Sequence, residues 1–199
     1  MDLQLRYRVG DKASLELALG NIVDETTDAI VNAANSSLLG GGGVDGAIHR
    51  AAGPQLLAEC RKIRDQRGPL PPGQAVATLG GNLKARYVIH TVGPVWQGGS
   101  QNESQVLASC YLNSLQEADR LGCASMSFPS ISTGAFRYPV PQAAGIALRT
   151  LADLLRSPSS VLLARFVLFD RETHSAYAQA ARGLSSVLPH FQIGAQAIP

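Results

Sequence analysis

An aspartate and a histidine one helical turn apart give the first indication of chemistry in this sequence. Asp45 and His49 lie four residues apart at the start of a stretch with helical periodicity, so their side chains share one face. A carboxylate there could orient or deprotonate a water molecule. Two plainer interpretations stay open: Asp45 could be a helix N-cap, and His49 a half-buried histidine with satisfied hydrogen bonds. Upstream, Asn32 and Asn35 are either turn residues or donors and acceptors for sugar hydroxyls.

Four consecutive glycines, residues 40–43, separate these asparagines from Asp45. Glycines leave backbone N–H groups uncovered and permit positive φ angles. The helix that follows adds unpaired N–H groups and a dipole that attracts anions. A glycine run alone is equally typical of a flexible surface loop. Its position between a predicted buried strand and a helix favours a loop that binds a diphosphate.

A second loop, residues 129–139, also follows a predicted strand and precedes a helix. Ser132, Thr133 and Gly134 offer small side chains and exposed N–H groups, which suit the other side of a phosphate. Phe136 could pack over a sugar face or anchor the loop in the core. A serine nucleophile is not favoured, because neither loop has the G-x-S-x-G pattern.

Other nucleotide chemistries match poorly. Gly41, Gly43 and Gly46 fit the dinucleotide pattern G-x-G-x-x-G, but the acidic residues that follow fall on a charged helix instead of a strand end. No Gly-Lys-Ser/Thr sequence is present, which argues against a Walker loop. The cysteines, Cys60, Cys110 and Cys123, are widely spaced and form no recognisable metal-ligand cluster or disulfide scaffold. We therefore expect no metal and no cofactor.

The elements that must position these loops alternate between strand and helix. The pattern of apolar residues predicts strands at 14–19, 28–33, 74–79, 87–92, 125–131 and 163–169, and helices at 44–63, 102–121, 140–155 and 172–184. Pro129 should leave the end of its strand irregular. Such alternation is typical of a three-layer α/β domain, in which ligands bind outside the carboxyl ends of the strands.

The overall composition fits one globular domain. The chain has 199 residues, of which 45% are hydrophobic and 16% charged, and its net charge is +2. This balance gives no support to a nucleic-acid-binding arm. Neither an apolar secretion signal nor a run of the ~20 apolar residues that span a bilayer is present. We expect a cytoplasmic protein with a single domain over 1–199 and a core at about 14–184. We expect the tail, 185–199, to be poorly ordered, in particular after Pro189.

Several long segments resemble the macro domain family. They are DAIVNAAN (28–35), residues 40–49, VIHTVGP (88–94) and ISTG (131–134), and the likeness extends over about 15–182. The subclass resembles the MacroD type, and HTVGPVWQGGSQNESQ (90–105) and FDRE (169–172) resemble the bacterial O-acetyl-ADP-ribose deacetylases in particular. The resemblance implies an α/β/α sandwich around a mixed sheet of about six strands, with ADP-ribose bound across its top.

The resemblance also implies roles for individual residues. By position, Asn35, Asp45 and His49 match the distal-ribose and catalytic residues, and Phe136 matches the aromatic over that ribose. The first diphosphate loop corresponds to Gly41, Gly42, Gly43 and Val44, and the second to Ser132, Thr133, Gly134, Ala135 and Phe136. Further ligand contacts are expected from Asn21, Ile22, Asn32 and Asp170.

Two positions depart from the family pattern. Asn21 stands where the family usually has the aspartate that receives the adenine amino group; an asparagine oxygen still accepts that hydrogen bond, but without charge. Arg137 places a cation before Tyr138, where either an added phosphate contact or a narrower entrance would follow.

The function implied is hydrolysis of O-acetyl-ADP-ribose, with Asp45 acting on the water, and removal of mono-ADP-ribose from acidic side chains of modified proteins. The alternative is a non-catalytic module that reads ADP-ribose. The presence of Asn35, Asp45 and His49 together favours the enzyme. An RNA-processing or protein-interaction role has no independent support, since basic and aromatic residues do not interleave.

Overall fold

The computed structural model describes residues 4–194, which form one mixed sheet with helices on both faces. Its strands are β1 (Gln4–Val9), β2 (Ala13–Leu19), β3 (Ala29–Ala33), β4 (Ala75–Leu79), β5 (Tyr87–Thr91), β6 (Ser125–Phe128), β7 (Leu163–Leu168) and β8 (Phe191–Ile193). Its helices are the 3₁₀ turn η1 (Ile22–Asp24) and α1 (Gly43–Ala52), α2 (Pro54–Arg67), α3 (Glu103–Arg120), α4 (Val140–Leu154) and α5 (Arg171–Ser185).

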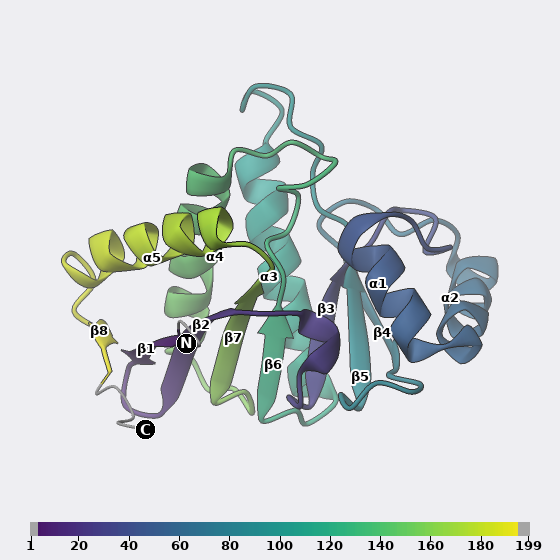
Figure 1. Cartoon of the computed structure of the whole chain (residues 1–199), viewed down its shortest axis with the longest axis horizontal. Coiled ribbons are helices and arrows are strands. Elements are labelled where there is room, and N and C mark those ends of the chain that lie inside the picture. The colour runs from purple at the N-terminus through teal and green to yellow at the C-terminus, as the bar shows by residue number, and fades with distance from the viewer. Residues whose placement is uncertain (1–3, 195–199) are drawn as a thin grey trace.

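The strand order places the predicted loops at one edge of the sheet. The order is β4-β5-β3-β6-β7-β2-β1-β8, and the five strands from β5 to β2 run parallel (Figure 1). The carboxyl ends of all five therefore meet at the same edge. β4 and β1 are antiparallel to their neighbours, which makes the sheet mixed, as the resemblance implied.

Side-chain alternation along the strands divides the interior into two layers. The larger core lies against α3, α4 and α5 and contains Phe128, Phe166 and Tyr177. Ile30 and Val88 point to the other face and pack with Ile48 of α1 and Leu56 of α2. Figure 1 shows α1 and α2 beside β4 and β5, while α4 and α5 lie toward β2 and β1.

Two expectations about the elements were wrong. The helix expected at 44–63 is two helices, because Gly53 has φ of 81° and Pro54 supplies no N–H to continue the first one. The sheet has eight strands where about six were expected, since β1 and β8 were not predicted.

The structure describes part of the predicted tail. Residues 191–193 form β8 and pair with β1, and the buried ring of Phe191 stacks on Tyr7 at 4.7 Å. Part of the segment expected to be poorly ordered is thus held by strand pairing and an aromatic contact; its last residues, 195–199, lie outside the described part of the chain. Between residues 4 and 194, no helix has the length and apolar character to cross a bilayer.

Candidate active site

Two adjoining cavities open along the carboxyl edge of the sheet. The first, about 320 Å³, is lined by Ala33, Ala34, Asn35, Gly41, Gly42, Gly43, Val44, Asp45, Gly93, Ser130, Ser132, Gly134, Ala135 and Phe136. The second, about 510 Å³, is lined by Gly20, Asn21, Ile22, Gly43, Val44, Ala47, Arg50, Pro129, Ser130, Thr133, Gly134, Val167, Phe169, Asp170 and Thr173. Four residues line both: Gly43, Val44, Ser130 and Gly134. The cavities therefore meet between the start of α1 and the loop after β6.

The start of α1 presents bare backbone at this junction. The helix begins at Gly43, and its N-cap, Gly42, makes no side-chain hydrogen bond to the first turn. Helix N-termini that lack a side-chain cap leave N–H groups for a ligand or water. Gly46 allows the glycine loop to fold onto the helix, because a Cβ there would overlap the carbonyl oxygen of Gly41. The glycine loop is thus folded back against its helix.

The second loop is held by its own hydrogen bonds. Ser132 has φ of 67° and accepts a backbone hydrogen bond from Tyr138 at 3.0 Å. Thr133 Oγ1 donates to Ser130 Oγ at 2.8 Å, and Tyr177 of α5 donates to the same oxygen at 3.1 Å. The Ser132 hydroxyl is buried and has no hydrogen-bond partner among residues 4–194. An unpaired hydroxyl on a cavity wall is available to a ligand.

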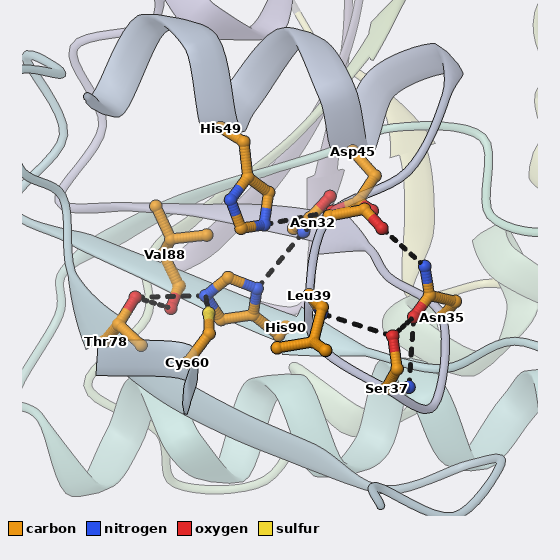
Figure 2. A network of polar contacts seen from close by, with 11 residues as sticks. Asn32, Asn35, Ser37, Leu39, Asp45, His49, Cys60, Thr78, Val88 and His90 are labelled. Carbon is orange, nitrogen blue, oxygen red and sulfur yellow. Dashed lines mark hydrogen bonds and ion pairs between the residues drawn. The ribbon is translucent and has the colours of Figure 1, made fainter. Parts of the chain in front are cut away.

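Asp45 is buried, with one carboxylate oxygen inward and the other toward the first cavity. Its Oδ1 accepts a hydrogen bond from Asn32 Nδ2 at 2.7 Å and lies 3.4 Å from His49 Nε2 (Figure 2). Its Oδ2 lies at the cavity wall, close to Gly41. If Gly41 carried a side chain, its Cβ would come within 3.0 Å of this oxygen. A carboxylate with one anchored oxygen and one oxygen beside a cavity is suited to hold a water molecule.

Asn35 lies next to Asp45 in the same cavity. The same Cβ on Gly41 would come within 3.2 Å of Asn35 Nδ2. That nitrogen donates to Gly40 O at 2.9 Å, while Oδ1 accepts from the backbone N–H and hydroxyl of Ser37. Its amide thus shapes the glycine loop beside the cavity that Asn35 lines.

Most of the predicted site residues line one of the two cavities, but two do not. Asn32 is wholly buried beneath Asp45, to which its amide donates, and its expected contact with a sugar stays a prediction. His49 lies behind Asp45, with 13% of its side chain exposed. Asn21 and Asp170 line the second cavity while capping η1 and α5, through Val23 N and Thr173 N respectively.

Other residues of the site were not singled out from the sequence. Gly93, Ser130 and Arg50 line the cavities, as does Phe169, which is 81% exposed. Their positions could have identified them: three follow parallel strands of the sheet, and Arg50 lies on the exposed side of α1. Arg137, by contrast, is exposed and lines neither cavity.

One cluster beneath the site has metal-ligand residue types. Within residues 4–194, His49, Cys60 and His90 bring ligand atoms within 4.8 Å of one another. Burial raises the pKa of the Cys60 thiol to about 12, with further contributions from the charges of Asp45 and Glu59. His90 Nδ1 faces Asn32 Nδ2, a pure donor, at 3.1 Å, so the ring proton lies on Nε2 toward Thr78. In the metal-free protein this thiol and Nε2 both carry protons, which a metal would have to displace.

Comparisons with known proteins agree with this geometry. The macro domain family matches residues 31–147. An O-acetyl-ADP-ribose deacetylase of Citrobacter koseri is 56% identical over 83% of this chain and 94% of its own. The Oceanobacillus iheyensis macrodomain solved with ADP is 43% identical, with a TM-score of 0.88 over 92% of this chain and 97% of its own. A Trypanosoma brucei macrodomain in complex with ADP-ribose is 39% identical, with a TM-score of 0.75 over 83% and 68% of the two chains. On this sequence and fold similarity, the chain belongs to the macro domain family.

Proposed function

We propose that this macro domain binds ADP-ribose along its two joined cavities and hydrolyses the ester of O-acetyl-ADP-ribose. One observation carries the proposal: the buried carboxylate of Asp45 presents Oδ2 at the wall of a cavity that joins a second one through the N-terminus of α1. A relative 56% identical to this chain is named for that deacetylase activity.

The diphosphate would lie where the cavities meet. There the uncapped start of α1 and the loop around Gly134 offer N–H groups from two sides. The adenosine would occupy the cavity of Asn21, Ile22 and Asp170, with Phe169 exposed at its wall. The distal ribose would then lie in the cavity of Asn35, Asp45 and Phe136.

The hydrolysis needs one water molecule and no covalent intermediate on the protein. Asp45 Oδ2 accepts a hydrogen bond from the water, whose oxygen attacks the acetyl carbonyl carbon. The bond between that carbon and the ribose oxygen breaks, the ribose oxygen takes up a proton, and acetate and ADP-ribose leave. A positioned general base contributes roughly 10²–10⁴-fold to such a step.

The same geometry would accept a protein substrate. An ADP-ribose linked to a glutamate or aspartate side chain is also an ester of the distal ribose, so the attack is chemically equivalent. We extend the proposal to mono-ADP-ribosylated proteins on that basis. The domain would act as one unit over residues 1–199 in the cytoplasm, a reducing setting that suits the buried free thiols of Cys60, Cys110 and Cys123.

The experiment is to incubate the purified protein with O-acetyl-ADP-ribose and follow acetate release, with ADP-ribose binding measured by calorimetry in parallel. We expect both binding and catalytic turnover. Binding of ADP-ribose without hydrolysis of O-acetyl-ADP-ribose or of a mono-ADP-ribosylated protein would instead identify a non-catalytic reader.

A further inference from the structure

A row of polar side chains lies buried under α1 and α2 on an otherwise apolar sheet face. Asn32 of β3 and His90 of β5 are register partners, and Thr78 of β4 lies beyond them. The exposed fraction is 0% for Asn32 and His90 and 5% for Thr78. Their neighbours on this face are aliphatic, such as Ile30 and Val88. Polar groups in such a place are costly unless each is hydrogen-bonded.

Hydrogen-bond chemistry fixes the direction of every contact in this row. The two hydrogens of Asn32 Nδ2 go to Asp45 Oδ1 at 2.7 Å and to His90 Nδ1 at 3.1 Å. His90 Nδ1 must therefore accept, and its Nε2 must carry the proton and donate to Thr78 Oγ1 at 3.0 Å. Thr78 in turn donates toward Val88 O at 3.5 Å. Figure 2 shows the row from Thr78 to Asp45.

The protonation state of His90 agrees with this direction. Burial and, to a smaller extent, the nearby charge of His49 lower the pKa of His90 to about 3. A neutral ring keeps the lone pair on Nδ1 that Asn32 requires. The amide is held at both hydrogens, so it can rotate only by breaking one of these contacts.

The row reaches the proposed site at a single carboxylate oxygen. Asn32 holds Oδ1 of Asp45, which leaves Oδ2 at the cavity wall near Gly41. Rotation of the carboxylate would therefore cost the charge-assisted hydrogen bond from Asn32, the strongest type in the row. The Oδ1 of Asn32 has no partner in the described part of the chain, so the amide takes part in the row through its two N–H groups.

We propose that His90 is a positioning residue for the hydrolysis, acting through Asn32 to fix the carboxylate of Asp45 for its water. This proposal rests on the proposed function, since it assumes that Asp45 acts on the water. His90 does not touch the substrate; its lone pair sets the orientation of the Asn32 amide. Thr78 supports the same ring tautomer from the far side.

Two substitutions of His90 separate this role from plain packing. His90→Asn places an amide oxygen near the position of Nδ1 and keeps an acceptor for Asn32. His90→Gln places its amide near Nε2, beside Thr78, and removes that acceptor. Cys60→Ala is the control, because the thiol lies 3.7 Å from His90 Nε2 but outside the row.

The measurements are kcat for O-acetyl-ADP-ribose and the Kd of ADP-ribose, on variants checked for folding. For His90→Gln we expect kcat to fall about 10- to 100-fold, as misplaced catalytic groups do, with Kd within about twofold. His90→Asn should recover kcat to within about fivefold of the wild type, and Cys60→Ala should keep it within about twofold. Equal losses in the two His90 variants, or an unchanged kcat in His90→Gln, would overturn the proposal.

Nitrogen NMR of the wild-type protein gives a test that needs no variant. We expect His90 as the neutral tautomer with its proton on Nε2, and a proton on Nδ1 would overturn the proposal. Failure here is distinguishable from failure of the proposed function: Asp45→Ala would still abolish catalytic turnover if only the role of His90 were wrong.

Discussion

Gly93, after β5, and Ser132, in the loop after β6, are packed so closely that a Cβ on Gly93 would overlap the Ser132 hydroxyl. The same Cβ would lie 2.7 Å from Ile131 Cγ2. Both residues line the cavity that contains Asp45. The shape of that cavity therefore depends on the absence of a side chain at residue 93.

Gly93→Ala should weaken ADP-ribose binding by displacing the second loop. Overpacking of this kind costs roughly 1–3 kcal/mol, and about 1.4 kcal/mol corresponds to a tenfold change in Kd. Calorimetric titration of ADP-ribose measures the change. Gly145→Ala on α4, where a Cβ meets nothing within 4 Å, is the matched control and should bind normally.

The double variant Gly93→Ala with Ser132→Gly provides the rescue. It removes the overlapping hydroxyl and relieves the positive φ of Ser132. Partial recovery of the lost affinity is expected, because the close contact with Ile131 Cγ2 remains. An affinity equal to the wild type in Gly93→Ala alone would show that the loop does not depend on this contact.

Asn21→Asp should strengthen the preference for adenine. Asn21 is exposed at the wall of the second cavity, and its Oδ1 accepts only a 3.4 Å hydrogen bond from Val23 N. A carboxylate accepts from an amino group about twice as strongly as a neutral amide does. The Kd of ADP-ribose should fall a few-fold, while that of inosine diphosphate ribose, which lacks the amino group, should not. Parallel tightening of both ligands would contradict this placement of the base.

The buried neutral state of His90 should make stability depend on pH. His90 is faced by His49 of α1, Cys60 of α2, Thr78 of β4 and Asn32 of β3. Its pKa is about 3 in the folded protein, through burial and the charge of His49, against ~6.5 unfolded. Between these values the unfolded chain binds more protons, so the free energy of unfolding falls as pH falls, by up to ~1.4 kcal/mol per pH unit.

Urea unfolding of the wild type and of His90→Asn from pH 7 to pH 4 isolates this contribution from that of the carboxylates. The variant should lose stability less steeply, by the equivalent of up to about one proton. Identical slopes for the two proteins would mean that His90 is protonated in the folded state or is not buried in solution.

The sequence predicted the central elements because their patterns are local. The apolar run of β3 and the glycines before α1 follow from neighbouring residues alone, and the resemblance implied that the sheet is mixed. β8 was missed because its three residues are fixed by pairing with β1, from the opposite end of the chain. The break at Gly53 was signalled by Gly-Pro, but the apolar periodicity continues across it.

The sequence predicted which loops form the candidate site, but not the polar contacts that lie buried beneath it. Asp45 and Asn35 were identified by residue type and position. That Asn32 points inward follows from strand alternation, which places it with Ile30 on the face toward α1. Its partnership with His90 depends on strand register, 58 residues apart in sequence, and no local pattern carries it.

The most direct test of the central claim is the kcat of Asp45→Ala for O-acetyl-ADP-ribose, measured with its Kd for ADP-ribose. We expect a kcat lower by roughly 10²–10⁴-fold, with the Kd within about threefold of the wild type. Acetate release at the wild-type rate from a folded Asp45→Ala protein would contradict it.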